Sequence, residues 1–216
     1  ACGVRLADGC ELQADAVVFN GDAGALAQGL LGADAVRATA AVPHARRSLS
    51  ALTWAVHARC SGFALERHNV FFCDDYRREF DDLQRRRQLP QQGTVYVCAQ
   101  DRGDAAHAPS GRERLLCLVN APADGDRRPF DPSEIEPCLQ RSQDLLQHCG
   151  LQLEAGAPQV VSSPATFHQL FPGTGGALYG AASHGWMALF RRSGSTSRLP
   201  GLYLAGQITG VEGYLQ

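Results

Sequence analysis

The sequence of 216 residues predicts a mixed fold of the α/β or α+β class, and three observations support this. A nearly continuous apolar segment at 14–19, followed by a helix-start signal, is typical of a β-α unit. Apolar segments at wide spacing between 48 and 119 are typical of an antiparallel sheet. Apolar residues at steps of three and four between 135 and 149 predict an amphipathic helix.

The first part of the chain predicts a hairpin, a strand and a helix. Asp8-Gly9 separates two short segments, and this dipeptide is typical of hairpin turns in which both residues have positive φ. The apolar segment at 14–19 predicts a parallel strand that is covered on both faces. Asp22 is the expected N-cap of a helix that continues through Leu31.

The middle of the chain predicts four strands, around residues 48–56, 69–72, 94–97 and 115–119. We expect a helix at 74–87, because its acidic start and basic end interact favourably with the helix dipole. Its last arginines, 85–87, are expected in solvent, with anionic lipid as the alternative.

The amphipathic pattern after residue 130 predicts a helix with a capping box formed by Ser133 and Glu136. Gly150 is the expected stop signal of this helix. Two further strands are predicted, one near Val160 and one at 202–204.

The composition excludes several kinds of chemistry. The 20 basic residues, all arginine, nearly balance 22 acidic residues, which argues against a nucleic-acid partner. Because the chain has no lysine, a Schiff-base lysine and a phosphate-loop lysine are excluded. The eight cysteines have no metal-ligand spacing, so no metal site is predicted. Cysteines inside apolar segments, such as Cys98 and Cys117, favour buried thiols in a reducing, cytoplasmic compartment.

Glycines and aromatic residues mark two candidate binding regions. Gly206, Gly210 and Gly213 follow a predicted strand, where backbone amides can approach a phosphate or a flavin ring; a plain glycine-rich turn is the alternative. Five aromatic residues are candidates for the wall of an elongated apolar tunnel, with ordinary core packing as the alternative for each: Trp54, Phe71, Phe171, Tyr179 and Trp186. Ser183 lies outside a Gly-x-Ser-x-Gly elbow, and no catalytic residue is assigned.

Four segments together resemble the carotenoid desaturase family, and within it the desaturases of hydroxylated carotenoids. They are residues 6–22, 48–54, 68–72 and 171–186, of which the last is the most specific. The resemblance implies an FAD-dependent enzyme that acts on long polyenes drawn from membranes by peripheral contact. Its flavin domain is expected in two pieces, interrupted by a substrate domain.

This resemblance implies a division of the chain and a set of site residues. Residues 1–44 and 195–216 are expected to be parts of a Rossmann-like FAD domain, and 45–194 an inserted sheet-and-helix substrate domain. The N-terminal dinucleotide-binding part, with its glycine fingerprint, is expected to precede residue 1. The expected FAD contacts are Asn20, Gly21, Gly206, Gln207, Gly210 and Gly213, and the expected substrate contacts are Trp54, Phe171, Tyr179, His184 and Trp186.

Two alternatives remain at this point. Residues 206–214 resemble the folate-dependent tRNA uridine methyltransferases, another group of flavoproteins. The balanced charge and the cysteines in apolar segments argue against that activity. The second alternative is a non-catalytic module that binds an apolar ligand.

Overall fold

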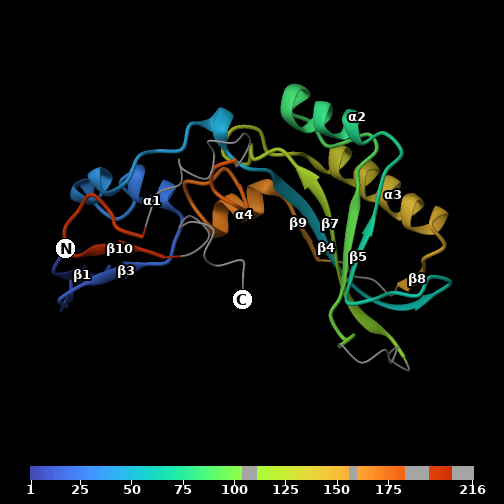
Figure 1. Ribbon diagram of the computed structural model, residues 1–216, viewed down its shortest axis with the longest axis horizontal. Helices are drawn as coiled ribbons and strands as arrows, with labels where there is room; N and C mark the ends of the chain where they lie inside the picture. Colours follow the sequence, from blue (N-terminus) through green and yellow to red (C-terminus); the bar gives the residue numbers. More distant parts are fainter. Residues whose placement is uncertain (104–110, 156–159, 183–194, 206–216) are drawn as a thin grey trace.

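The computed structural model describes residues 1–103, 111–155, 160–182 and 195–205. Figure 1 shows an elongated molecule with two parts. The smaller part holds the N-terminus and the last strand, and the larger part is built around a six-stranded sheet. The fold is therefore mixed α/β, as predicted. No helix in the described ranges is long and apolar enough to span a bilayer.

The chain begins with the expected hairpin, in which β1 (Gly3–Arg5) pairs antiparallel with β2 (Glu11–Gln13). The turn differs from the prediction, because only Gly9 has a positive φ, +87°, whereas Asp8 does not. The Leu6 carbonyl accepts a hydrogen bond from the Gly9 amide at 3.0 Å. The hairpin therefore has a three-residue loop, residues 7–9, between Leu6 and Cys10, and the left-handed Gly9 is its last residue.

Strands from opposite ends of the chain form the small parallel sheet. β3 (Val17–Phe19) pairs with β10 (Leu202–Leu204), in the register Phe19 to Leu204. Leu202 and Leu204 pack against Leu26 of α1 (Ala23–Ala27), which covers one face. On the other face Val18 is 66% exposed, so the prediction of a strand covered on both faces is wrong for the described residues.

Helix α1 starts as predicted and ends early. The Asp22 carboxylate accepts a hydrogen bond from the Gly24 amide at 2.7 Å, which confirms the N-cap. The helix stops at Ala27 because Gly29 adopts a φ of +77°. Two 3-10 helices follow, η1 (Ala33–Ala38) and η2 (His44–Arg46).

The large sheet contains the four predicted strands. They are β4 (Ser50–Ser61), β5 (His68–Phe71), β6 (Val95–Ala99) and β7 (Glu113–Ala121). The order is β5-β6-β7-β4-β8, with every pair antiparallel, and β9 also pairs with β4. β8 (Gln152–Ala155) was not predicted, whereas β9 (Val160–Ser162) matches the strand expected near Val160.

One face of this sheet is covered by α3 (Pro132–His148), as Figure 1 shows. The helix is confirmed, but its capping box is formed by Asp131 and Glu134 and not by the predicted Ser133 and Glu136. Pro132 explains the earlier start, because its fixed φ suits the first helical position. Gly150, with a φ of +91°, is the predicted stop.

The predicted charged helix is divided into α2 (Tyr76–Phe80) and a π-helical turn, η3 (Asp81–Arg86). Arg87 ends it in a left-handed conformation, with a φ of 54°. The Arg87 guanidinium donates to the Asp124 carboxylate at 2.8 Å, so this residue is not in solvent as expected. A further helix, α4 (Pro164–Leu170), was not predicted.

Segments from both parts meet at a junction. Arg47 makes two hydrogen bonds to Asp126, at 2.7 and 2.8 Å. Gly173 lies against α1 so closely that a Cβ there would be 2.8 Å from the Gly24 carbonyl carbon. The Gln28 amide donates to the Gly173 carbonyl at 2.9 Å. Gly173 therefore allows the backbone of the larger part to contact α1 of the smaller one.

Candidate functional site

The first candidate region lies at the carboxyl ends of β3 and β10. The Ala205 amide donates to the Phe19 carbonyl at 3.0 Å, so the residues after both strands begin side by side. Asn20 and Gly21 follow β3 directly and are exposed. In parallel sheets, ligands bind outside the carboxyl ends of the strands. The other expected cofactor contacts lie outside the described residues: Gly206, Gln207, Gly210 and Gly213.

The second candidate region is the face of the large sheet opposite α3, which we call the open face. Side chains on alternate positions of neighbouring strands meet there, for example Val70 with Tyr96 and Tyr96 with Leu118. A parallel row joins Cys98, Leu116 and Ala55. We define the open face by Ala55, Val70, Tyr96, Cys98, Leu116, Leu118 and Val160.

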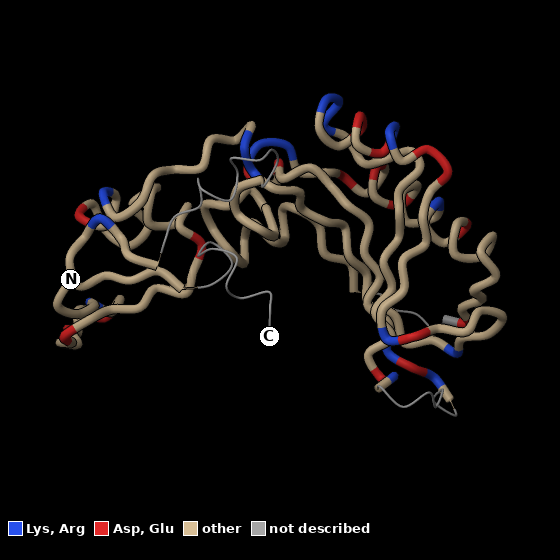
Figure 2. The backbone as a smooth tube through the Cα atoms, in the orientation of Figure 1, with Lys and Arg blue, Asp and Glu red and all other residues tan. Residues whose placement is uncertain are grey.

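The open face is apolar and accessible. Val70 is 50% exposed and Leu116 and Leu118 are half-buried, although all three are apolar. Figure 2 shows the strands of this sheet tan along most of their length, with charged residues at their lower ends and on α2. Apolar surface that stays exposed across several strands commonly marks a binding surface.

The polar groups on the open face have partners. The Tyr96 hydroxyl hydrogen-bonds to His68 Nδ1 at 2.6 Å. Burial raises the pKa of Tyr96, and a hydrogen bond with Cys98 raises it further. The phenol therefore stays protonated at neutral pH and adds no charge to this surface.

The structure brings some of the predicted substrate contacts to this face and not others. Tyr179 lies at the start of β4, where its amide donates to Ser48 Oγ at 2.9 Å, and it interacts electrostatically with Tyr96. Phe171 is exposed at the end of α4. Trp54 lies on the opposite face, under α3, and is 0% exposed. Phe71, also a candidate for the tunnel wall, belongs to the same core cluster and is 4% exposed, so core packing is its role here. His184 and Trp186 lie outside the described residues.

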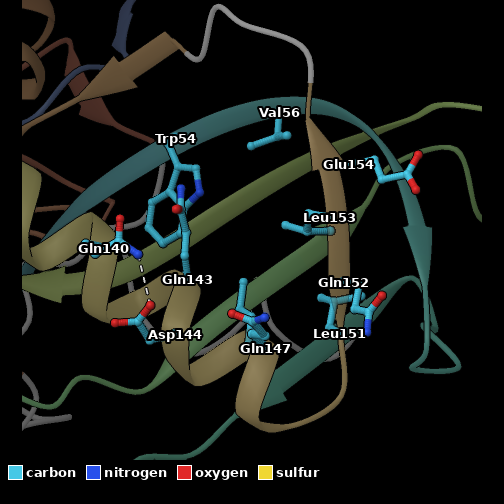
Figure 3. A pocket seen from close by; sticks show the side chains of 11 residues that line it. Trp54, Val56, Gln140, Gln143, Asp144, Gln147, Leu151, Gln152, Leu153 and Glu154 are labelled. Carbon is cyan, nitrogen blue, oxygen red and sulfur yellow. Dashed lines mark hydrogen bonds between the residues drawn. The ribbon is translucent and has the colours of Figure 1, made fainter.

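Trp54 borders a separate pocket of about 460 Å³ between α3 and β8. Figure 3 shows the indole near Gln143 and Gln140, with Leu153 and Val56 on the strand side. The indole Nε1 is buried and has no hydrogen-bond partner among the described residues. Because the sheet separates this pocket from the open face, Trp54 and Tyr179 do not line one cavity.

Sequence reasoning missed a buried polar cluster at the edge of the open face. Glu79 is 0% exposed, and its Oε2 accepts hydrogen bonds from the Thr94 hydroxyl at 2.8 Å and the Cys73 thiol at 3.5 Å. Its Oε1 accepts one from Asn120 Nδ2 at 3.4 Å. Asn120 gives a sequence signal, because it is a polar residue in the alternation that places Leu116 and Leu118 on the open face. Glu79 gives none, since it stands among other charged residues.

Comparison with known proteins decides the family. A family model described as flavin-containing amine oxidoreductase matches residues 1–216. The chain belongs to this family. Membership confirms FAD as the expected cofactor and, with the relatives below, confirms the resemblance to carotenoid desaturases.

Several curated relatives of this flavin-containing family are desaturases. A hydroxyneurosporene desaturase of Rubrivivax gelatinosus is 67% identical over 208 residues, covering 95% of this chain and 39% of the relative. One from Cereibacter sphaeroides is 42% identical, over 95% of this chain and 41% of the relative. A 1-hydroxycarotenoid 3,4-desaturase of a Flavobacterium species is 28% identical, over 74% of this chain and 33% of the relative. The chain thus spans about 40% of the length of the first two relatives. Residues 206–214, which resemble the methyltransferases, lie outside the described residues, and the family match includes them.

The residues at the ends of β3 and β10 fit one edge of a flavin site in this family. Asn20 offers an exposed polar side chain there. At Gly21 a Cβ would lie 2.5 Å from the Phe19 ring, so a larger residue there would displace that side chain. Helix α1 has five residues, and the Gly24 amide in its first turn already donates to Asp22. The start of this short helix is therefore a poor cradle for a pyrophosphate.

Proposed function

We propose that this chain belongs to an enzyme that desaturates a hydroxylated carotenoid with FAD. The observation that carries the proposal is the open face, an accessible apolar surface of the kind that a long polyene requires. The names of the relatives supply the chemistry: a hydroxyl at carbon 1 and a new double bond between carbons 3 and 4.

Desaturation removes two hydrogens from adjacent carbons, one as a hydride and one as a proton. When bound, the flavin accepts the hydride. The residues of this chain hold and orient the polyene and exclude water from it. No described side chain is assigned as the base that takes the proton.

The open face can hold an extended chain across its strands. Its two rows of side chains cross β5, β6, β7 and β4, and one of them continues to Val160 of β9. Five strands at about 4.8 Å spacing give a surface roughly 19 Å wide. Burial of apolar surface contributes about 25 cal/mol per Å², so a polyene lying there is held without polar contacts along its length.

We propose the division into an FAD domain, 1–44 with 195–216, and a substrate domain, 45–194. The parallel pairing of β3 with β10 supports it. The exposed Val18 and its half-exposed partner Tyr203 also support it, because they fit a sheet face that another segment covers.

Site residues follow from this division. We propose FAD contacts at Asn20, Gly21, Gly206, Gln207, Gly210 and Gly213, and substrate contacts at Phe171, Tyr179, His184 and Trp186. Trp54 is not among them, because it packs in the core on the sheet face that α3 covers. We also propose peripheral contact with a membrane, and exposed Leu30, Leu31 and Val36 after α1 support it.

A charge placed on the open face tests the substrate assignment. In a full-length protein carrying this chain, Leu118→Arg should lower kcat/KM for a 1-hydroxycarotenoid about 100-fold, because the polyene would have to displace the solvation of a guanidinium. Conversion is measured by the red shift of carotenoid absorption. Leu12→Arg, on the half-exposed hairpin strand, is the matched control and should leave the rate unchanged. An active Leu118→Arg enzyme with normal flavin content would refute the assignment.

Flavin retention tests the proposed division of the FAD domain. The chain alone, mixed with excess FAD and desalted, should retain little flavin, because α1 is short and its Gly24 amide is already capped by Asp22. The full-length protein should retain about one flavin per chain. Stoichiometric flavin absorbance on the chain alone would show that this chain holds the main cofactor contacts.

A further inference from the structure

We propose that Asn120 accepts a hydrogen bond from the substrate hydroxyl, and that the buried carboxyl of Glu79 holds Asn120 in place for this purpose. The inference rests on the proposed function, since it concerns the same open face. It assigns Asn120 as the group that distinguishes a hydroxylated polyene from one without a hydroxyl. The relevant geometry comes from the sheet register and from four hydrogen bonds.

Asn120 continues the open face by one row toward the end of the sheet. It follows Leu118 by two residues on β7, so both side chains lie on the same face. Val95 pairs with Val119, which places Thr94 beside Asn120. A polar pair therefore borders the apolar rows of Leu118 and Leu116.

Glu79 connects this polar pair. One of its carboxyl oxygens accepts from Thr94 Oγ1 at 2.8 Å and the other from Asn120 Nδ2 at 3.4 Å. Among the described residues no arginine or histidine forms an ion pair with Glu79, although its side chain is fully buried. A buried carboxyl is costly unless it is hydrogen-bonded, so its neutral donors are held firmly around it.

The third donor, Cys73, remains a thiol. Burial raises the pKa of Cys73, and the neighbouring Glu79 raises it further. The thiol therefore keeps its proton at neutral pH and donates to Glu79 Oε2. Cys73 Sγ also lies 3.6 Å from Thr94 Oγ1, so the thiol and the hydroxyl are neighbouring neutral donors to one carboxyl.

The bond to Glu79 fixes the direction of the Asn120 amide. Because Nδ2 donates to the carboxyl, Oδ1 is the free end of this half-buried side chain, and within the described ranges it has no hydrogen-bond partner. An amide oxygen with a free lone pair at the edge of an apolar surface suits a single hydroxyl donor. It offers nothing to a hydrocarbon end, for which its desolvation is a cost.

The position of the cluster agrees with the proposed reaction. The hydroxyl carbon is two bonds from the carbon pair that is desaturated, so the hydroxyl must be held near the reacting bond. The cluster lies where β7 ends and β4 begins, which is the end of the large sheet joined to the flavin part. Figure 1 shows this end turned toward α4 and the smaller part.

Substrate discrimination in the full-length holoenzyme tests the inference. The ratio of kcat/KM for a 1-hydroxycarotenoid to that for the matched polyene without the hydroxyl is measured for three proteins. Asn120→Leu should lower the ratio about 10- to 100-fold, by loss of turnover on the hydroxylated substrate alone. Thr94→Val, which removes a neighbouring donor to the same carboxyl, should keep most of the ratio.

Each result is decisive. If Asn120→Leu slows both substrates equally, or if Thr94→Val lowers the ratio as much, Asn120 has only a structural role and the inference is wrong. If Asn120→Leu fails to fold, as judged by its flavin content, Asn120→Ala provides the same comparison. If the unmodified enzyme desaturates neither polyene, the proposed function itself fails, which separates the two outcomes.

Discussion

Replacing Trp54 by alanine is expected to lower the free energy of unfolding by about 3–5 kcal/mol, the range for large aromatic side chains in cores. The indole is 0% exposed and lies in the core cluster with Leu52, Val97 and Cys117, between the sheet and α3. Alanine would leave a cavity that its neighbours can fill only in part. Denaturant unfolding followed by circular dichroism measures the loss.

Trp54→Phe is the matched control for this substitution. Because the buried indole Nε1 has no partner in the part of the chain that the structure describes, phenylalanine removes apolar volume without breaking a described hydrogen bond. The phenylalanine variant should therefore lose less than half as much stability as the alanine variant. Equal losses would mean that the indole nitrogen has a partner in solution, and a loss below about 1 kcal/mol for alanine would mean that side chains collapse into the neighbouring pocket.

Glu113→Ala should destabilise the protein by about 3 kcal/mol, because it leaves Arg102 without its partner. Glu113 is 2% exposed and accepts two hydrogen bonds from the Arg102 guanidinium, each at 2.8 Å. Arg102 also donates to the Leu65 carbonyl at 2.6 Å and cannot easily turn to solvent. Denaturant unfolding followed by circular dichroism measures this loss of stability as well.

Arg114, the residue after Glu113, supplies the control for Glu113→Ala. Arg114 pairs with Asp101 on the other face of β7, but both are exposed, so Arg114→Ala should change stability very little.

The Arg102 hydrogen bonds hold the pKa of Glu113 below its usual value. Its contribution is therefore present at neutral pH and is lost as the pH falls through that lowered pKa. The difference between Glu113→Gln and the unmodified protein should shrink in acid; a constant difference down to about pH 2 would contradict the ion pair.

Periodicity and turn residues were enough to predict most of the elements. Alternation in β4, β6 and β7 identified the sheet, and apolar spacing identified α3. The errors lie where a local signal had two solutions. Asp131 and Ser133 are both good N-caps, and Pro132 at the first helical position decided for Asp131. Asp8-Gly9 suits two turn types, and only the structure shows which residue has positive φ.

The site was harder to predict because faces and pairings are tertiary properties. Trp54 and Ala55 are neighbours in sequence but lie on opposite faces of β4, and aromatic character alone does not show which face binds a ligand. Glu79 reaches Asn120 only because α2 is placed at the end of β7. No pattern in either segment indicates that contact.

The pairing of β3 with β10 sets an order of events during synthesis. All strands of the large sheet lie between Ser50 and Ser162, so that sheet can assemble before β10 is made. β3 precedes these strands in the chain, whereas its partner β10 follows them. The nascent β3 therefore lacks its partner β10 while the whole large sheet is synthesised, and the β3–β10 sheet forms after the large sheet can form.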